Sequence, residues 1–133
     1  MRILIAEDEN ILGDVLKDEF ESDGFEVSIA RNGKEALEIM KSKSNRPDIV
    51  LLDLMMPVLN GFKFLEEIQK DETYNLKAIP VIVSSSLGQD EDIKKVMKLG
   101  AADYFVKSQH PISELIEKVK TFLEKPKDIF VKR

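Results

Sequence analysis

Short apolar runs rich in Ile, Val and Leu recur along the chain and alternate with longer amphipathic stretches. The runs predict five β-strands, over Ile3–Ala6, Phe25–Ala30, Asp48–Leu52, Ile79–Val83 and Asp103–Val106. The first strand and the Ile49–Leu52 part of the third are apolar at every position, which is typical of central strands. The second strand alternates apolar and polar residues and is therefore predicted at an edge.

Each predicted strand is followed by apolar positions at helical spacing. The first helix is expected to end at Asp23-Gly24 and to bury one face, made of Ile11, Leu12, Val15, Leu16 and Phe20. The other four are expected to begin at Asn32-Gly33, near Asn60-Gly61, at Asp90-Glu91-Asp92 and after Pro111. Gly13 inside the first helix costs about 1 kcal/mol relative to Ala. The sequence alone gives no reason for this glycine.

The alternation of strands and helices along the chain predicts right-handed βαβ crossovers and a parallel sheet covered by helices on both faces. We therefore expect an α/β fold, a doubly wound five-stranded parallel sheet of order 2-1-3-4-5 of the flavodoxin-like type. In such sheets ligands bind outside the carboxyl ends of the strands, where the winding direction reverses. Here that point lies between the first and third strands.

The composition excludes several classes of protein. The chain has 133 residues, 43% of them hydrophobic, which suits one domain with its own core. It has no cysteine, so disulfide scaffolds and thiolate chemistry are excluded. Its apolar runs are too short for a membrane span, and its net charge of −5 disfavours nucleic-acid binding. We expect a cytoplasmic protein that binds neither membrane nor nucleic acid.

Polar and charged residues stand where four predicted strands end. They are Glu7-Asp8-Glu9, Asp53, Ser84-Ser85-Ser86 and Lys107. Parallel strands bring their carboxyl ends to one edge, so these side chains should converge there. Carboxylates held together raise one another's pKa unless a cation neutralises them, and a hard divalent cation such as Mg²⁺ accepts carboxylate oxygens.

An ionised carboxylate in such a site can attack a phosphoryl group and form an aspartyl phosphate. Asp53 is the candidate nucleophile, Lys107 would hold the transferred group, and a hydroxyl of the fourth strand would donate to it. Each residue also has a purely structural interpretation, with Asp8 and Asp53 as caps, the serines as turn formers and Lys107 as a solvated strand end. Their coincidence at four strand ends favours a site.

Four motifs in order resemble the response-regulator receiver domain of two-component signalling, from Arg2 to about Leu123. They are Ile3-Leu4-Ile5-Ala6-Glu7-Asp8-Glu9, Asp53-Leu54-Met55-Met56-Pro57-Val58-Leu59-Asn60-Gly61, Ile79-Pro80-Val81-Ile82-Val83-Ser84-Ser85 and Gly100-Ala101-Ala102-Asp103-Tyr104-Phe105-Val106-Lys107. The expected domain covers residues 1–124. Residues 125–133 form a short C-terminal tail, too short for an output domain, so we expect a single-domain regulator.

The resemblance implies a site in which Asp53 accepts phosphate with the help of Mg²⁺. Asp8 would bind the ion directly and Glu7 partly through water, and Asp53 and the backbone carbonyl of Met55 would complete the metal site. Lys107 matches the lysine of the family.

The resemblance also implies a switch. Ser85 matches the Ser/Thr position that is drawn to the phosphate, and Tyr104 matches the aromatic residue that then swings inward. The fourth helix, fifth strand and fifth helix would change shape. Partners implied are a histidine kinase or phosphotransfer protein, and a second copy of the chain bound through this surface. Several lysines lie on or near it, either as a solvated face or as a contact for an acidic partner, namely Lys94, Lys95, Lys98, Lys118 and Lys120.

Four positions depart from the family pattern without removing a catalytic group. Ser108 replaces the usual Pro after Lys107, Asn60 replaces a commoner Asp, Ser85 replaces Thr and Glu7 replaces Asp. The positions that tune phosphate lifetime are apolar, Met55 and Leu87, which predicts slow self-dephosphorylation.

Two alternatives compete with a phosphorylated switch, which would not be a turnover enzyme. A receiver-like interaction module could act without phosphorylation, although the complete set of site residues speaks against it. A haloacid-type phosphatase would need a second acid two residues past its nucleophile, where Met55 stands.

Overall fold

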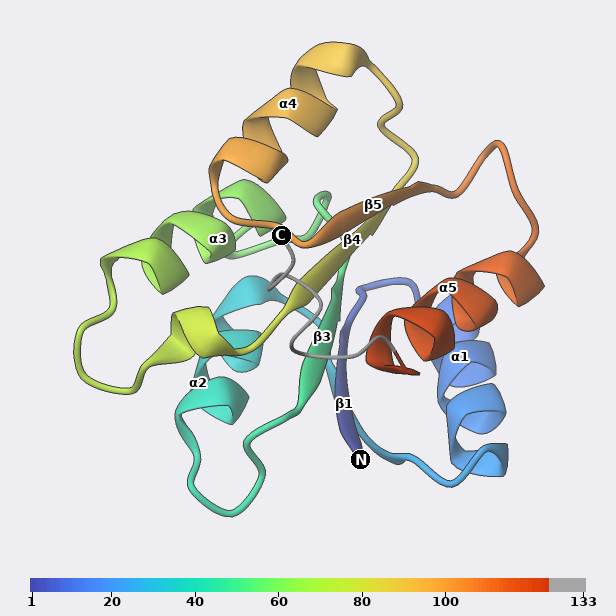
Figure 1. Ribbon diagram of the computed structural model, residues 1–133, viewed down its shortest axis with the longest axis horizontal. Coiled ribbons are helices and arrows are strands. Elements are labelled where there is room, and N and C mark those ends of the chain that lie inside the picture. The colour runs from blue at the N-terminus through green and yellow to red at the C-terminus, as the bar shows by residue number, and fades with distance from the viewer. Residues whose placement is uncertain (125–133) are drawn as a thin grey trace, which may run out of the picture.

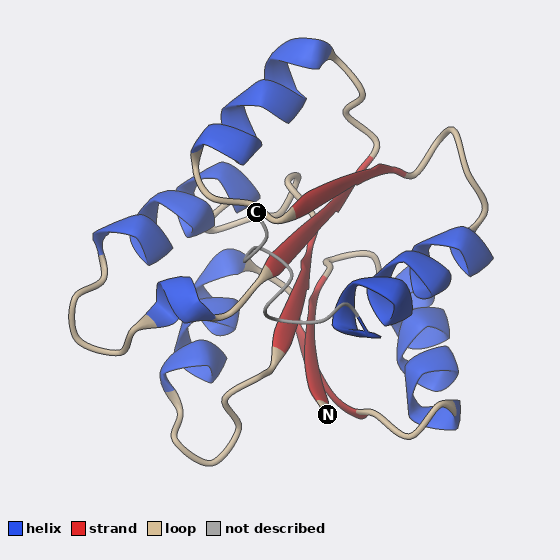
Figure 2. Ribbon diagram, viewed as in Figure 1, coloured by secondary structure: helices blue, strands red, loops and turns tan. Residues whose placement is uncertain are grey.

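The structure is a computed structural model that describes residues 1–124; the expected tail at 125–133 lies outside the described residues. Five strands form one parallel sheet of order β2-β1-β3-β4-β5 (Figures 1 and 2). The strands are β1 (Arg2–Ala6), β2 (Glu26–Ala30), β3 (Ile49–Leu52), β4 (Val81–Ser85) and β5 (Asp103–Val106). The predicted doubly wound, flavodoxin-like α/β fold and its strand order are confirmed.

Helices cover both faces of the sheet. They are α1 (Asn10–Ser22), α2 (Gly33–Lys41), α3 (Gly61–Lys70), α4 (Asp90–Lys98), α5 (Ile112–Glu124) and the short 3-10 helix η1 (Leu76–Ala78). Helices α1 and α5 pack on one face, and α2, α3 and α4 on the other (Figure 1). The side chains of Asn32 and Asn60 cap α2 and α3 by accepting hydrogen bonds of 2.9 Å from the third residue of each helix. The two Asn-Gly pairs therefore start helices as predicted.

Alternate residues of the central strands fill two separate cores. On β1, Leu4 and Ala6 pack on the side of α2 and α3, whereas Ile3 and Ile5 pack on the side of α1 and α5. All four are at most 1% exposed. This burial on both faces explains why the run contains no polar residue.

Two predictions from the sequence are wrong in detail. The pattern predicts the fourth strand over Ile79–Val83, but β4 runs from Val81 to Ser85. Pro80 has no N–H for the ladder, and the strand continues because Ser85 pairs with Val106 of β5.

The buried face of α1 is also narrower than predicted. Ile11 and Val15 are 77% and 42% exposed, whereas Leu16 and Phe20 are buried. Residues four apart share a helix face, so the row from Leu12 through Leu16 to Phe20 turns Ile11 and Val15 away from the sheet.

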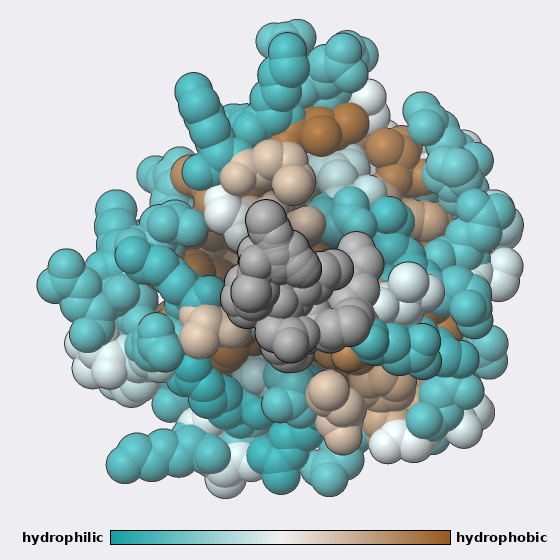
Figure 3. All heavy atoms as spheres, viewed as in Figure 1, coloured by the Kyte–Doolittle hydropathy of each residue, from teal (hydrophilic) through white to brown (hydrophobic). Residues whose placement is uncertain are grey.

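Hydrophilic side chains cover most of the face seen in Figure 3. Among residues 1–124, no helix has the length and apolar character needed to cross a membrane. Three large apolar side chains are nevertheless exposed beyond the carboxyl ends of β1 and β3, namely Ile11, Met55 and Val58.

Candidate functional site

The carboxyl ends of β1 and β3 bring three acids together. The backbone N–H of Asp53 donates to the carbonyl of Ala6, and that of Glu7 to the carbonyl of Ala30, each at 2.9 Å. The strand ladder thus extends to both acids. One carboxylate oxygen from each of Glu7, Asp8 and Asp53 lies within 4.8 Å of the others. Glu7 and Asp53 are only 4% and 7% exposed, whereas Asp8 is open to solvent.

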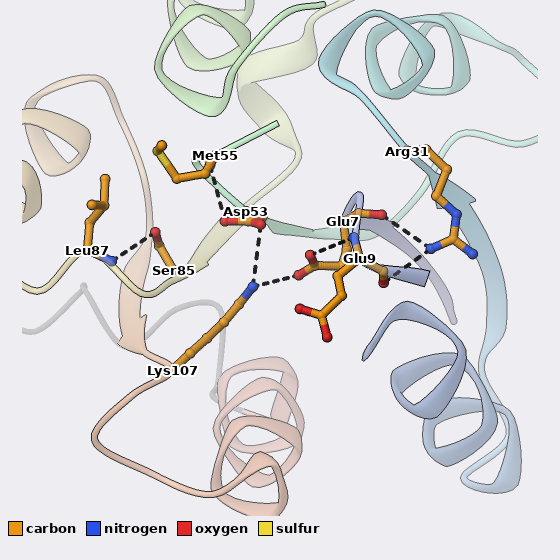
Figure 4. A network of polar contacts seen from close by, with 8 residues as sticks. All are labelled: Glu7, Glu9, Arg31, Asp53, Met55, Ser85, Leu87 and Lys107. Carbon is orange, nitrogen blue, oxygen red and sulfur yellow. Dashed lines mark hydrogen bonds and ion pairs between the residues drawn. The ribbon is translucent and has the colours of Figure 1, made fainter. Parts of the chain in front are cut away.

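Lys107 reaches this cluster from the end of β5 (Figure 4). Its Nζ donates to Glu7 Oε1 at 2.6 Å and lies 3.4 Å from Asp53 Oδ2. Its backbone N–H donates to the carbonyl of Ser85 at 2.9 Å, which fixes the root of the side chain. The ammonium group therefore lies closer to Glu7 than to the candidate nucleophile.

The electrostatic state of Asp53 follows from its burial. Removal from water raises the pKa of this carboxyl from its usual 3.8 to about 6. The positive charge of Lys107 opposes the rise, and the negative charge of Glu7 adds to it. Three acids around one ammonium group leave a negative excess among the described residues. A divalent cation would relieve that excess, and carboxylate oxygens are the donors Mg²⁺ prefers, so these residues fit the ion.

The loop after β3 is held against the site at several points. The backbone N–H of Met55 donates to Asp53 Oδ1 at 3.2 Å, while the Met55 side chain is 60% exposed. The role of its carbonyl as a metal ligand stays a prediction. A Cβ at Gly61 would lie 2.7 Å from the carbonyl oxygen of Asp53, so only glycine lets α3 begin so near the acid. Val58 between them has a positive φ of 68°, which is strained for a β-branched residue.

The same loop is also attached to α2. The backbone N–H of Gly33 donates to the carbonyl of Leu59 at 3.0 Å. A Cβ at Gly33 would overlap that carbonyl oxygen. The first residue of α2 therefore supports one wall of the site.

The predicted switch residues meet at one residue of the β4–α4 loop. The hydroxyl of Ser85, which is fully buried, accepts a hydrogen bond of 3.2 Å from the backbone N–H of Leu87. The hydroxyl of Tyr104 donates to the carbonyl of the same Leu87. Figure 4 shows Ser85 and Glu7 on opposite sides of Asp53. Burial raises the pKa of Tyr104, so this hydroxyl keeps its proton and remains a donor.

Several charged residues outside the cluster pair within the chain. Lys118 lies 3.0 Å from Asp103, and Lys120 lies 3.4 Å from Asp23. The ammonium group of Lys95 lies 4.4 Å from the centre of the Phe62 ring. Three of the five lysines noted in the sequence therefore have partners on the domain itself.

One residue near the acids does not emerge from the sequence. Arg31, directly after β2, points its guanidinium at the backbone of the acidic segment (Figure 4). The sequence points to Arg31 only indirectly, through Gly13 inside the first helix, where a Cβ would meet the Arg31 side chain.

A doubly wound α/β domain with a buried aspartate, two further acids and a lysine at its switch point belongs to the flavodoxin-like class. The model of the family described as response regulator receiver domain matches residues 3–120. The chain therefore belongs to the family of response-regulator receiver domains.

Individual relatives agree with this assignment. The chain is 39% identical over 121 residues to the chemotaxis protein CheY of Thermotoga maritima, covering 89% of this chain and 96% of that protein. It is 34% identical over 124 residues to the response regulator ArlR of Staphylococcus saprophyticus, covering 93% of this chain but only 53% of that protein. The solved receiver domain of HemR from Leptospira biflexa, in its non-phosphorylated form, superposes with a TM-score of 0.80 at 30% identity, covering 94% and 95% of the two chains.

Proposed function

We propose that this chain is a phosphorylation-dependent switch that accepts a phosphoryl group on Asp53. As a receiver domain it belongs to two-component signalling. The convergence of Glu7, Asp8 and Asp53 with Lys107 carries the proposal, because it joins a nucleophile, a cation site and a fixed positive charge. The donor would be the phosphohistidine of a histidine kinase or of a phosphotransfer protein.

In the proposed transfer, a carboxylate oxygen of Asp53 attacks phosphorus. A phosphorus–oxygen bond forms, the phosphorus–nitrogen bond to the donor imidazole breaks, and that nitrogen takes up a proton. Mg²⁺ bound by Glu7, Asp8 and Asp53 would neutralise charge on the transferred group. Lys107 lies 3.4 Å from Asp53, so it would shift from Glu7 toward the phosphoryl oxygens and hold them.

Phosphorylation would be read through Ser85 and Leu87. The Ser85 hydroxyl now accepts a hydrogen bond from the N–H of Leu87, whereas it would donate a stronger, charge-assisted hydrogen bond to a phosphoryl oxygen on Asp53. Turning that hydroxyl toward Asp53 releases the N–H of Leu87, whose carbonyl holds Tyr104. The β4–α4 loop and Tyr104 would move together, and the surface of α4, β5 and α5 would change.

Acetyl phosphate and Mg²⁺ followed by intact mass measurement test this function. We expect one added phosphoryl group, lost when Mg²⁺ is removed and lost in Asp53→Asn. Asp18→Asn is the matched control, because Asp18 is an exposed acid of α1 outside the cluster, and it should label like the wild type. If the wild type takes up no phosphate from this donor or from a phosphorylated phosphotransfer protein, the chain acts as an interaction module without phosphorylation.

The surface of α4, β5 and α5 is also the proposed contact for a second copy of the chain. Met97 on α4 is 43% exposed beside Lys94 and Lys98. Sedimentation of the protein before and after phosphorylation tests this contact. A mass that stays monomeric in both forms would exclude it.

Slow loss of phosphate is expected from the residues around Asp53. Met55 offers an exposed thioether and Leu87 packs partly into the core, so neither side chain orients an attacking water. Met55→Asn should shorten the lifetime of the phosphoryl group on Asp53 by at least about tenfold, because the Asn amide can bind a water and orient it for attack on phosphorus. A wild-type lifetime of seconds would contradict this expectation.

A further inference from the structure

Arg31 touches the backbone of the acidic segment rather than its side chains. Its Nη1 lies 3.4 Å from the carbonyl oxygen of Glu7 and 3.5 Å from that of Glu9, and it donates to both. These two carbonyls stand on either side of Asp8, the exposed member of the acid cluster. One planar group thus contacts the backbone of Glu7 and of Glu9, on both sides of Asp8 in the chain (Figure 4). The side chain of Asp8 itself is exposed.

Arg31 itself is held at both ends. Its backbone N–H donates to Glu35 Oε1 at 3.0 Å, in the first turn of α2. Its Nη2 lies 3.3 Å from Asp14 Oδ1 on α1. The side chain is 33% exposed and reaches from the β2–α2 loop past the acidic segment to α1. The guanidinium therefore has a defined position from which it can restrain the Glu7–Glu9 backbone.

Gly13 supplies the space for this arrangement. A Cβ at position 13 would lie 2.5 Å from Nη1 of Arg31, closer than unbonded atoms approach. A glycine in the middle of a helix is less favourable than alanine, so α1 gives up helix stability at this position. The glycine that the sequence leaves unexplained is where the guanidinium packs against the helix.

We propose that Arg31 is a positioning residue for the Mg²⁺ site and that Gly13 is required for its placement. By restraining the backbone around Asp8, it keeps that carboxylate within reach of those of Glu7 and Asp53. The proposal rests on the proposed function, because it takes these acids as the ion site. A group that contacts a metal ligand, and not the metal itself, can orient that ligand and so raise the affinity for the ion.

The direction in which Mg²⁺ affinity changes when Arg31 is removed separates a positioning role from a purely electrostatic one. Arg31 carries a positive charge beside a cation site, so removing that charge alone would strengthen Mg²⁺ binding. Loss of positioning would weaken it. The two explanations therefore predict opposite shifts in the dissociation constant.

The test is titration of the purified chain with MgCl₂ by calorimetry. Arg31→Ala should raise the Mg²⁺ dissociation constant by about tenfold, the lower end of what such supporting contacts contribute. Arg31→Lys keeps the positive charge but lacks the planar guanidinium group, so its Mg²⁺ dissociation constant should lie between those of the wild type and Arg31→Ala. Asp18→Ala removes an exposed acid from the same helix α1 at a position with no contact to Arg31, and it should stay within about twofold of the wild type.

Gly13→Ala provides an independent second variant. The added methyl group meets the tip of a flexible side chain, so the guanidinium should move and the helix should remain folded. We expect thermal stability at least equal to that of the wild type, yet Mg²⁺ binding weakened as in Arg31→Ala. Adding Gly13→Ala to Arg31→Ala should cause no further weakening, because the group it displaces is already gone.

The outcomes separate this proposal from the proposed function. A wild-type chain that neither binds Mg²⁺ nor accepts phosphate would overturn the function itself. A wild type that does both, beside an Arg31→Ala variant with equal or tighter Mg²⁺ binding, would overturn only the role of Arg31. If the role is correct, Arg31→Ala should regain the wild-type rate of labelling by acetyl phosphate at saturating MgCl₂.

Discussion

The edge of the sheet at the carboxyl ends of the strands has two halves that are held together in different ways. The charged half consists of Glu7, Asp53 and Lys107, whose side chains lie within ion-pair distance. The neutral half consists of Ser85 and Tyr104, and each makes one hydrogen bond to Leu87. The strong ion pairs of the charged half hold the reacting side chains in place. The neutral half can rearrange by exchanging two weak hydrogen bonds, which suits the part that must move.

The largest expected effect is in the charged half. Lys107→Met should lower the free energy of unfolding by about 3 kcal/mol at pH 8, because two buried carboxylates lose their counter-charge. Urea denaturation measures the change, and MgCl₂ should restore much of it. Lys118→Met is the control, since its ion pair with Asp103 is exposed and should contribute less than about 1 kcal/mol. Equal losses in both variants would contradict the distinction between the two halves.

The pH dependence of stability is the next effect. The pKa of Asp53 rises from 3.8 in the unfolded chain to about 6 in the folded one. The folded state therefore binds the proton more tightly, and the stability this gives is complete below pH 3.8 and is lost as the pH rises through 6. Without Mg²⁺, the free energy of unfolding should fall by about 1–2 kcal/mol between pH 5 and pH 7 because of this group.

Asp53→Asn isolates that contribution, since every other titrating group is retained. The difference in urea stability between the two proteins should grow with pH in favour of the variant. If the stability difference between the two proteins does not change with pH, the pKa of Asp53 is not raised in the folded chain.

The neutral half should respond more weakly. Tyr104→Phe and Ser85→Ala each remove one hydrogen bond and should each lower the free energy of unfolding by about 1 kcal/mol. Both bonds hold Leu87, so the double variant should lose less than the sum of the two. Tyr74→Phe, at a tyrosine 44% exposed, should change stability by less than about 0.5 kcal/mol. Strict additivity would show that the two bonds act independently.

The smallest effect concerns the strained loop of the charged half. Val58 is 76% exposed with a φ of 68°, so its side chain adds little packing while its backbone is strained. Val58→Asn should raise the free energy of unfolding by about 0.5 kcal/mol, because Asn tolerates this conformation. Val58→Ala, which keeps a Cβ without the branch, should gain less. A loss of stability in Val58→Asn would mean that the exposed side chain makes a contribution of its own.

The sequence predicts the sheet well because its central strands are buried on both faces. Ile3 and Leu4 belong to different cores, and only a strand covered on both sides needs both to be apolar. Element ends are harder to predict, since the end of β4 depends on its pairing with β5. The exposure of Ile11 depends on the rotation of α1, which a broad apolar pattern leaves open.

For the site, the sequence predicts which residues converge but not how they pair. The rule for parallel strands places Glu7, Asp53 and Lys107 at one edge. The shorter contact of Lys107 with Glu7 depends on side-chain conformations that no motif encodes. The link from Ser85 to Tyr104 through Leu87 depends on the loop backbone. Arg31 contacts the acidic segment, α1 and α2, at residues 4 to 24 positions away in the sequence, and no motif encodes these contacts.

The attachment of the loop after β3 to the first residue of α2 has a consequence for engineering this domain. Gly33 holds that loop through Leu59, and Arg31, two positions earlier, contacts the Glu7–Glu9 segment. A peptide tag or a foreign loop inserted between positions 31 and 33 would displace both supports in a single edit. The segment between α2 and β3 lies at the opposite end of the sheet, away from both supports.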